Sequence, residues 1–98
     1  MNLEFADDDY RRIDENPSYS GKWSQAIVSK FRNRMQLIRA AADEREFYAM
    51  RSLHFAQMKG DRSHQHSIRL NVQWRLIVEL KGKGVEKIVL VVGIEDYH

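Results

Sequence analysis

The spacing of the apolar residues changes once along the chain, and this change limits the folds that the chain can adopt. From about Ser24 to Ala42 the apolar residues recur every three or four positions, which predicts an amphipathic helix of about five turns. After Leu53 they alternate with polar residues or form continuous runs, which is typical of β-strands. Helices followed by consecutive strands predict an α+β fold, with two or three helices on one face of a mainly antiparallel sheet.

The same reading places the remaining elements. Leu3 and Phe5 predict a short first strand, and Asp7 to Asp9 supply an N-cap for a short helix over residues 8–15. Asp43 to Arg45 end the long helix, and residues 46–51 form either one further turn or a tight connection. The apolar stripe of that helix comprises Ala26, Ile27, Phe31, Met35, Ile38 and Ala42. Strands are expected over 53–57, 67–70, 74–80 and 88–94, with turns at 59–62, 71–72 and 81–84, and with Gly93 marking a bulge or close packing.

The length and composition exclude several classes of protein. The 98 residues, 43% of them hydrophobic, predict one globular domain over residues 1–98. The chain has no cysteine, which excludes disulfides and cysteine-ligated metal sites. No apolar run reaches the roughly 18 residues that a membrane span needs. The first residues are acidic, unlike a secretion signal, so we expect a cytoplasmic protein without membrane contact.

The charge is distributed unevenly. Residues 1–16 carry six acids and two bases, whereas residues 22–75 carry eleven bases and four acids. A basic body of this kind is typical of a protein that binds nucleic acid or an acidic protein, although charge-rich solvated helices give the same count.

No nucleotide-binding, P-loop, hydrolase or zincin motif occurs, so the chemical candidates are individual basic and imidazole groups. His64 and His66 are expected on one strand face, where they would bind metal only with a third ligand, and two half-exposed polar residues are the favoured interpretation. Arg69 and Arg75 lie on neighbouring predicted strands and would form an anion pocket if both point into one cleft. Trp74 is expected in the core. A core-like strand leads directly to Asp96, Tyr97 and His98, whose groups can share proton transfer.

Three segments of the second half resemble the HigB-type toxins of the RelE/ParE superfamily, also called the plasmid maintenance killer family. The segments are Lys59-Gly60-Asp61-Arg62, then SIRLNVQWR over 67–75, then IEDYH over 94–98. They occur in the order and at the spacing of the family, and the outline of strand, helices and sheet extends the resemblance to the whole chain.

The resemblance implies the toxin of a type II toxin–antitoxin system, with a RelE-like fold and ribosome-dependent mRNA endonuclease activity. It implies no metal and no cofactor. The implied partners are the ribosome with its mRNA and 16S ribosomal RNA, and a HigA-like helix-turn-helix antitoxin through which the complex reaches operator DNA.

The resemblance also implies roles for individual residues. Lys59 and Arg75 would lie at the scissile phosphate with Arg69 nearby, Tyr97 and His98 would orient the nucleotide or transfer protons, and Asp96 would hold these terminal groups. Contacts to ribosomal RNA phosphates are expected from Lys22, Arg32, Arg34 and Arg62.

Two positions depart from the family pattern. Many members have a histidine three residues before the lysine of KGD, where this chain has Ala56. His54 lies two residues earlier and, if 53–57 is a strand, shares a face with that position and could partly replace the histidine. Val72 stands where the family often has Asp or Gly. The missing histidine keeps open a catalytically weak module that binds antitoxin or RNA. A ParE-like toxin that acts on DNA gyrase is a separate alternative, and the set of Lys59, Arg69, Arg75 and His98 favours the nuclease over it.

Overall fold

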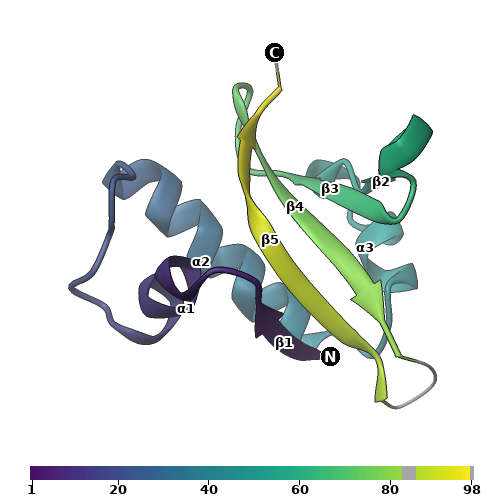
Figure 1. The fold of residues 1–98 in the computed structure, drawn as a ribbon, viewed down its shortest axis with the longest axis horizontal. Helices are drawn as coiled ribbons and strands as arrows, with labels where there is room; N and C mark the ends of the chain where they lie inside the picture. The colour runs from purple at the N-terminus through teal and green to yellow at the C-terminus, as the bar shows by residue number, and fades with distance from the viewer. Residues whose placement is uncertain (83–85, 98) are drawn as a thin grey trace.

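The protein folds as three α-helices packed against a five-stranded sheet (Figure 1), which confirms the expected α+β class. The structure is a computed structural model that describes residues 1–82 and 86–97. Its helices are α1 (Asp8–Glu15), α2 (Gln25–Ala40) and α3 (Arg45–Ala49), with two 3-10 turns, η1 (Arg51–Leu53) and η2 (Gly60–Arg62). Its strands are β1 (Asn2–Phe5), β2 (Ala56–Gln57), β3 (Gln65–Arg69), β4 (Trp74–Lys81) and β5 (Ile88–Asp96).

The sheet is mixed, in the order β1-β5-β4-β3-β2. β1 pairs with β5 in parallel, and the other three pairings are antiparallel. The near-continuous apolar run of β5 fits its place between β1 and β4, where Val89 and Val91 are fully buried.

The register between β4 and β5 shifts near Gly93, as the sequence predicted. Ile77 pairs with Gly93 while Val78 pairs with Val91, so β5 carries one extra residue at this point. Close packing explains the glycine, because a Cβ atom here would lie 3.2 Å from the Tyr10 hydroxyl. That hydroxyl accepts a hydrogen bond of 3.1 Å from the backbone N–H of Ile94 and so ties α1 to the bulge.

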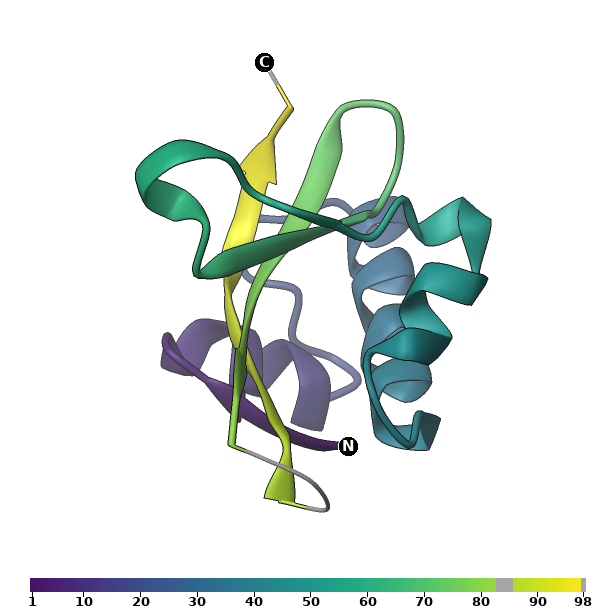
Figure 2. The same cartoon turned by 90° about the vertical axis from the view of Figure 1, so that its right-hand side faces the viewer.

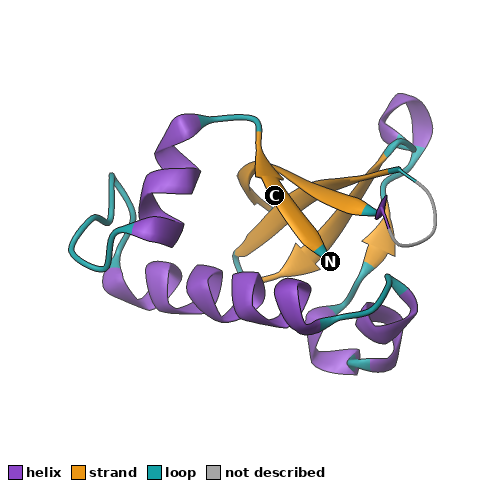
Figure 3. Ribbon diagram, turned by 90° about the horizontal axis from the view of Figure 1, so that it is seen from below, coloured by secondary structure: helices purple, strands orange, loops and turns teal. Residues whose placement is uncertain are grey.

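The helix α2 follows the predicted apolar stripe, and Figure 3 shows it running along one side of the sheet. The side chain of Ser24 caps its first turn, accepting a hydrogen bond from the N–H of Ile27. Two members of the predicted stripe are wrong: Ala26 and Ala42 are exposed, and Val28 and Ala41 are buried instead. The stripe is therefore wider than a three- and four-residue pattern indicates.

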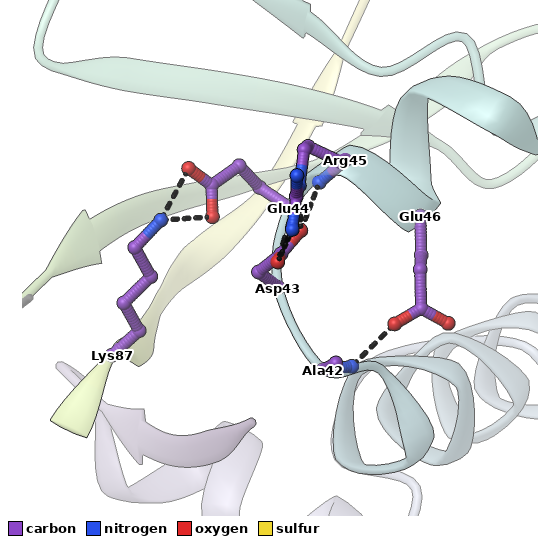
Figure 4. A network of polar contacts seen from close by, with 6 residues as sticks. All are labelled: Ala42, Asp43, Glu44, Arg45, Glu46 and Lys87. Carbon is purple, nitrogen blue, oxygen red and sulfur yellow. Dashed lines mark hydrogen bonds and ion pairs between the residues drawn. The ribbon is translucent and has the colours of Figure 1, made fainter. Parts of the chain in front are cut away.

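An acidic connection joins α2 to α3 and fastens both to the start of β5 (Figure 4). Lys87 donates to both carboxylate oxygens of Glu44, at 2.6 and 2.7 Å, which lowers the pKa of that carboxyl. Hydrogen bonds from the Arg45 side chain and backbone lower the pKa of Asp43 to about 2. Glu46 accepts from the N–H of Ala42. Of the two alternatives left open for residues 46–51, the structure has a further helical turn.

The expected strand over 53–57 is wrong in its first half. Leu53 ends η1 and His54 adopts a left-handed backbone with φ 46° and ψ 44°, so the strand begins only at Ala56. Leu53 and Phe55 are both buried, and their alternation reflects packing of a tight turn rather than a strand. In the described part of the chain, no helix combines the length and the apolar character that crossing a membrane requires.

The two faces of the sheet have different roles. Along β4, Leu76 and Val78 pack into the core beneath the helices, whereas Arg75 and Glu79 alternate with them and point to the other face. Figure 2 shows α2 and α3 on one side of this part of the sheet and the η2 turn on the other. We call the side of η2 the open face.

Candidate functional site

A groove of about 460 Å³ opens on this face, between the η2 turn and the end of β5. Lys59, Arg75 and Tyr97 line it, and an adjoining hollow is lined by Arg69 and Val72. His54 and Tyr97 belong to both hollows, so we treat them as one feature, the open-face groove. The structure thus brings together His54, Lys59, Arg69, Arg75 and Tyr97, five of the seven residues expected to be catalytic.

Strand pairing explains why residues distant in sequence meet here. Arg69 on β3 is the direct partner of Arg75 on β4, and Arg75 is the direct partner of Glu95 on β5. Directly paired residues of neighbouring strands point to the same face, so the three side chains form a row across the sheet. The two arginines therefore share one face, which is the geometric condition that the predicted anion pocket requires.

Arg75 is held loosely at the centre of this row. Its guanidinium lies 5.3 Å from the centre of the Tyr97 ring, and its Nη2 lies 3.7 Å from a Glu95 oxygen. Its Nε is buried and finds no hydrogen-bond acceptor within residues 1–82 and 86–97. A guanidinium with donors to spare is suited to bind a phosphate in two-pronged fashion.

Arg69 and His54 form the neighbouring part of the groove. The Nη1 of Arg69 lies 3.2 Å from the Nε2 of His54, and its Nε donates to the carbonyl of Asn71. The left-handed backbone of His54 is uncommon for a residue other than glycine, and it turns the imidazole into the groove beside Ala56. His54 therefore reaches the region of the missing family histidine by a different backbone route from the strand that the sequence predicted.

The C-terminal residues form the end of the groove. The N–H of Tyr97 donates to the carbonyl of Gln73, and the Gln73 side chain donates to Asp96 at 3.1 Å. Both bonds attach the end of β5 to the turn before β4. His98, also expected to be catalytic, lies outside the described residues.

The four residues expected to contact ribosomal RNA do not form one surface. Lys22 is exposed on the loop before α2, with its ammonium 5.1 Å from the Trp23 ring centre. Arg62 lies on η2 at the open face, where Glu95 accepts two hydrogen bonds from it, at 3.0 and 2.7 Å.

Two of the three arginines of α2, Arg32 and Arg34, point inward. Arg32 donates to three carbonyl oxygens, those of Ile13, Asn16 and Tyr19, and so closes the end of α1. Arg34 is 9% exposed and donates to the carbonyl of Arg69 from two nitrogens, at 2.9 and 2.8 Å. Burial lowers the pKa of Arg34. Three N–H groups of Arg32 bond to backbone carbonyls and Arg34 is buried, so the structure does not place this pair as freely exposed surface contacts.

The histidine pair is also divided. His66 stacks on Phe55 with ring centres 4.9 Å apart, whereas His64 is exposed and lies 3.9 Å from Glu79. The prediction that both imidazoles share one strand face is wrong, because β3 begins only at Gln65 and His64 belongs to the preceding turn. The described residues contain no group of three histidines or acids that could hold a metal ion. Trp74 packs on Trp23 against the core, as expected.

One member of the site was missed from the sequence. Glu95 sits between Arg62 and Arg75, and hydrogen bonds from Arg62 lower its pKa. In the sequence, Glu95 stands next to Asp96 at the end of the last predicted strand, and this position is the signal that could have identified it. An acid there looks like an ordinary strand end until the register is known.

The groove contains the groups that phosphate chemistry needs. Two guanidinium groups and one ammonium can offset negative charge, and an imidazole and a phenol can bind or move protons. Arg69 and Arg75 lie on strands of the sheet, and His54, Lys59 and Tyr97 lie just outside its strands. Groups of these types are able to bind an anion such as a phosphate.

The comparisons with known proteins concern the fold and the family. A solved structure of a YoeB/ParE toxin from Agrobacterium tumefaciens has the same fold, with a TM-score of 0.64 and 18% identity over 100% of each chain. That likeness shows that the two chains share a fold. A model of the family described as the RelE-like toxin of type II toxin–antitoxin system HigB matches residues 3–98. The chain therefore belongs to the HigB-like toxin family, and an antitoxin is its partner. A search of curated proteins gave no match.

Proposed function

We propose that this toxin cuts messenger RNA on the ribosome, with the 2′-hydroxyl of the RNA itself as the nucleophile. The observation that carries the proposal is the row of Arg69 and Arg75 on paired strands, facing Lys59 and Tyr97 across one groove. Family membership supports it, because the residues that line the groove are those that the resemblance assigns to the scissile phosphate.

The chemistry requires little beyond charge and proton transfer. The 2′-oxygen attacks the adjacent phosphorus as its proton leaves, and the bond to the 5′-oxygen breaks as that oxygen gains a proton. Negative charge builds up on the phosphate in between, where preorganised cations lower the barrier. Arg75 and Lys59 would stabilise this charge, with Arg69 beside them.

The proton-bearing groups would be Tyr97, His98 and His54. Tyr97 would orient the nucleotide or transfer a proton, and Asp96 would hold the end of β5 through its bond with Gln73. His54 replaces the family histidine only in part, because it approaches from a tight turn and its Nε2 already faces Arg69.

The proposed partners follow from the same assignment. A HigA-like helix-turn-helix antitoxin would neutralise the toxin and carry the complex to operator DNA. The toxin would act in the cytoplasm, where ribosomes and their messages are found. Lys22 is the proposed contact to 16S ribosomal RNA that remains exposed.

Primer extension on messages from briefly induced cells tests the proposal, with Arg75→Ala as the matched variant. We expect discrete cuts in register with codons from the wild type and none from the variant, while both bind the antitoxin equally. Intact messages from well-expressed wild type would contradict it.

A different outcome of this experiment would support the second candidate function. Antitoxin binding with neither growth inhibition nor cuts would identify a weak binding module, which the presence of Ala56 in the groove favours as the second candidate.

A further inference from the structure

A two-pronged ion pair joins the turn that carries Lys59 to the far strand of the groove. Arg62 is the last residue of η2, three positions after Lys59. Its Nη1 donates to Oε1 of Glu95 at 3.0 Å and its Nη2 donates to Oε2 at 2.7 Å. No backbone hydrogen bond links η2 to β5, because β4 and β3 lie between β5 and the residues near this turn.

Each of the three side-chain nitrogens of Arg62 donates a hydrogen bond. Its Nε donates to the side chain of Gln65 at 2.9 Å, and Gln65 donates in turn to Glu79 on β4. The guanidinium therefore presents one edge to β5 and another to β3. A residue engaged in this way is a strut between elements rather than a free phosphate contact.

The contacts of Glu95 with Arg62 and with Arg75 differ. It accepts two short hydrogen bonds from Arg62, but its distance to Arg75 is 3.7 Å, which is too long for a hydrogen bond. The carboxylate thus attracts Arg75 without engaging its donors. Arg75 is kept in the row and remains able to turn toward an incoming phosphate.

We propose that Glu95 is a positioning residue of the nuclease, which holds the Lys59 turn over the sheet through Arg62 and keeps Arg75 facing the groove. The inference rests on the proposed function, because it assigns to Glu95 and Arg62 the placement of the two cations nearest the scissile phosphate. This positioning role takes the place of the RNA contact that the sequence predicted for Arg62. Neither residue touches the RNA, and both act through Lys59 and Arg75.

Single-turnover cleavage of ribosome-bound message tests the proposal. The variants are Glu95→Gln, Arg62→Gln, Arg62→Lys and the double variant of the two glutamines. The rate at saturating toxin and the toxin concentration that gives half of that rate are measured separately. Misplacing catalytic groups by about 1 Å costs up to about 100-fold in rate, so we expect each single variant to lose about 10- to 100-fold in the saturating rate.

Three features separate a strut from an RNA contact. The half-saturating concentration stays near that of the wild type. Arg62→Lys is as slow as Arg62→Gln, because lysine keeps the charge but cannot form the two-pronged ion pair. The double variant is no slower than the slower single variant, because both changes break one connection.

Arg39 supplies the matched control. It forms the same kind of two-pronged pair with Asp14, at 2.7 and 2.5 Å, and this pair joins α2 to α1 away from the groove. Arg39→Gln therefore removes an equivalent pair and is expected to leave the saturating rate unchanged. A loss as large as that of Arg62→Gln would show that general loosening is the cause and would overturn the proposal.

Other results would also overturn it. Faster cleavage by Glu95→Gln would show that the carboxylate competes with the phosphate. A near-normal rate for Arg62→Lys with weaker binding for Arg62→Gln would show that Arg62 contacts RNA.

A readout without RNA separates this proposal from the proposed function. Amide NMR spectra of the free protein should show Glu95→Gln shifting the signals of residues 58–65, whereas Arg39→Gln leaves them in place. If the wild type cleaves nothing and these shifts still appear, the nuclease assignment fails and the strut stands. Unchanged signals of 58–65 would overturn the strut whatever the activity.

Discussion

Two arginines of α2, Arg32 and Arg34, and the two arginines of the sheet are the same residue type in different surroundings. Arg32 and Arg34 occupy a long basic helix, and their guanidinium groups bond to backbone carbonyls inside the fold. Arg69 and Arg75 occupy paired strands, and their guanidinium groups lie in the open-face groove. A count of charges treats all four as candidates for RNA binding. The acceptors that each one meets decide which of them remain available.

The difference teaches that a basic residue is best judged by what it bonds to. The carbonyl of Arg69 accepts hydrogen bonds from two nitrogens of Arg34 and holds this buried side chain against the strand that carries Arg69. Among the described residues, Arg75 meets an aromatic face and a carboxylate beyond hydrogen-bond distance. Substitutions in the two regions should therefore separate stability from activity.

The largest expected effect is loss of cleavage by Arg75→Ala. Removing one preorganised charge-stabilising donor costs about 10²- to 10³-fold in rate, so we expect a loss of at least this size in single-turnover cleavage. Thermal unfolding should change little, because Arg75 makes no strong structural bond with the rest of the described chain. Cleavage near the wild-type rate would remove the sheet arginines from the site.

Arg34→Ala should show the converse behaviour. It leaves the carbonyl of Arg69 without its side-chain donor inside the core, and an unsatisfied buried group costs about 1–3 kcal/mol of unfolding free energy. Urea denaturation measures this loss, and cleavage per folded molecule should fall much less than in Arg75→Ala. A fully stable but inactive Arg34→Ala would contradict the comparison.

Lys22→Ala should affect binding alone. Lys22 is exposed and does not line the groove, so the role expected for it is a phosphate contact. Losing one such contact should reduce the slope of log affinity against log salt concentration by about 1 for ribosome binding. The cleavage rate at saturating toxin should not change, and an unchanged salt slope would exclude Lys22 from the interface.

The smallest effect is expected outside both regions, at the Glu44–Lys87 pair of Figure 4. Lys87 lowers the pKa of Glu44 in the folded state, so the pair stabilises the fold above the unfolded pKa and this contribution is lost as the pH falls through the folded pKa. Glu44→Gln should therefore lower the melting temperature at pH 7 and have no effect at pH 2. The loss should be under about 1 kcal/mol, as for other partly exposed pairs, and an equal effect at both pH values would contradict this assignment.

Most of the fold could be predicted because its signals are local. The stripe from Ile27 to Ile38 and the apolar run of β5 depend on residues a few positions apart. The parallel pairing of β1 with β5 could not be read, since it joins segments more than eighty residues apart. The left-handed turn at His54 was hidden because two buried residues flank it as they would in a strand.

The site was predictable to the extent that residue type determines chemistry. Lys59, Arg75 and Tyr97 stand in recognisable segments, and the structure groups them. The burial of Arg34 depends on an acceptor 35 residues away, and the place of Glu95 depends on strand register. The residues adjacent to Arg34 and to Glu95 in the sequence do not indicate these distant partners.

The most direct test of the central claim compares one message in two settings. Purified wild-type toxin is given the same mRNA either free or held in the decoding site of purified ribosomes, and the products are mapped. The account predicts cuts in codon register on the ribosome-bound message, none on free RNA, and none from Arg75→Ala in either setting. Equal cutting of free and bound message, or no cutting of either, would contradict it.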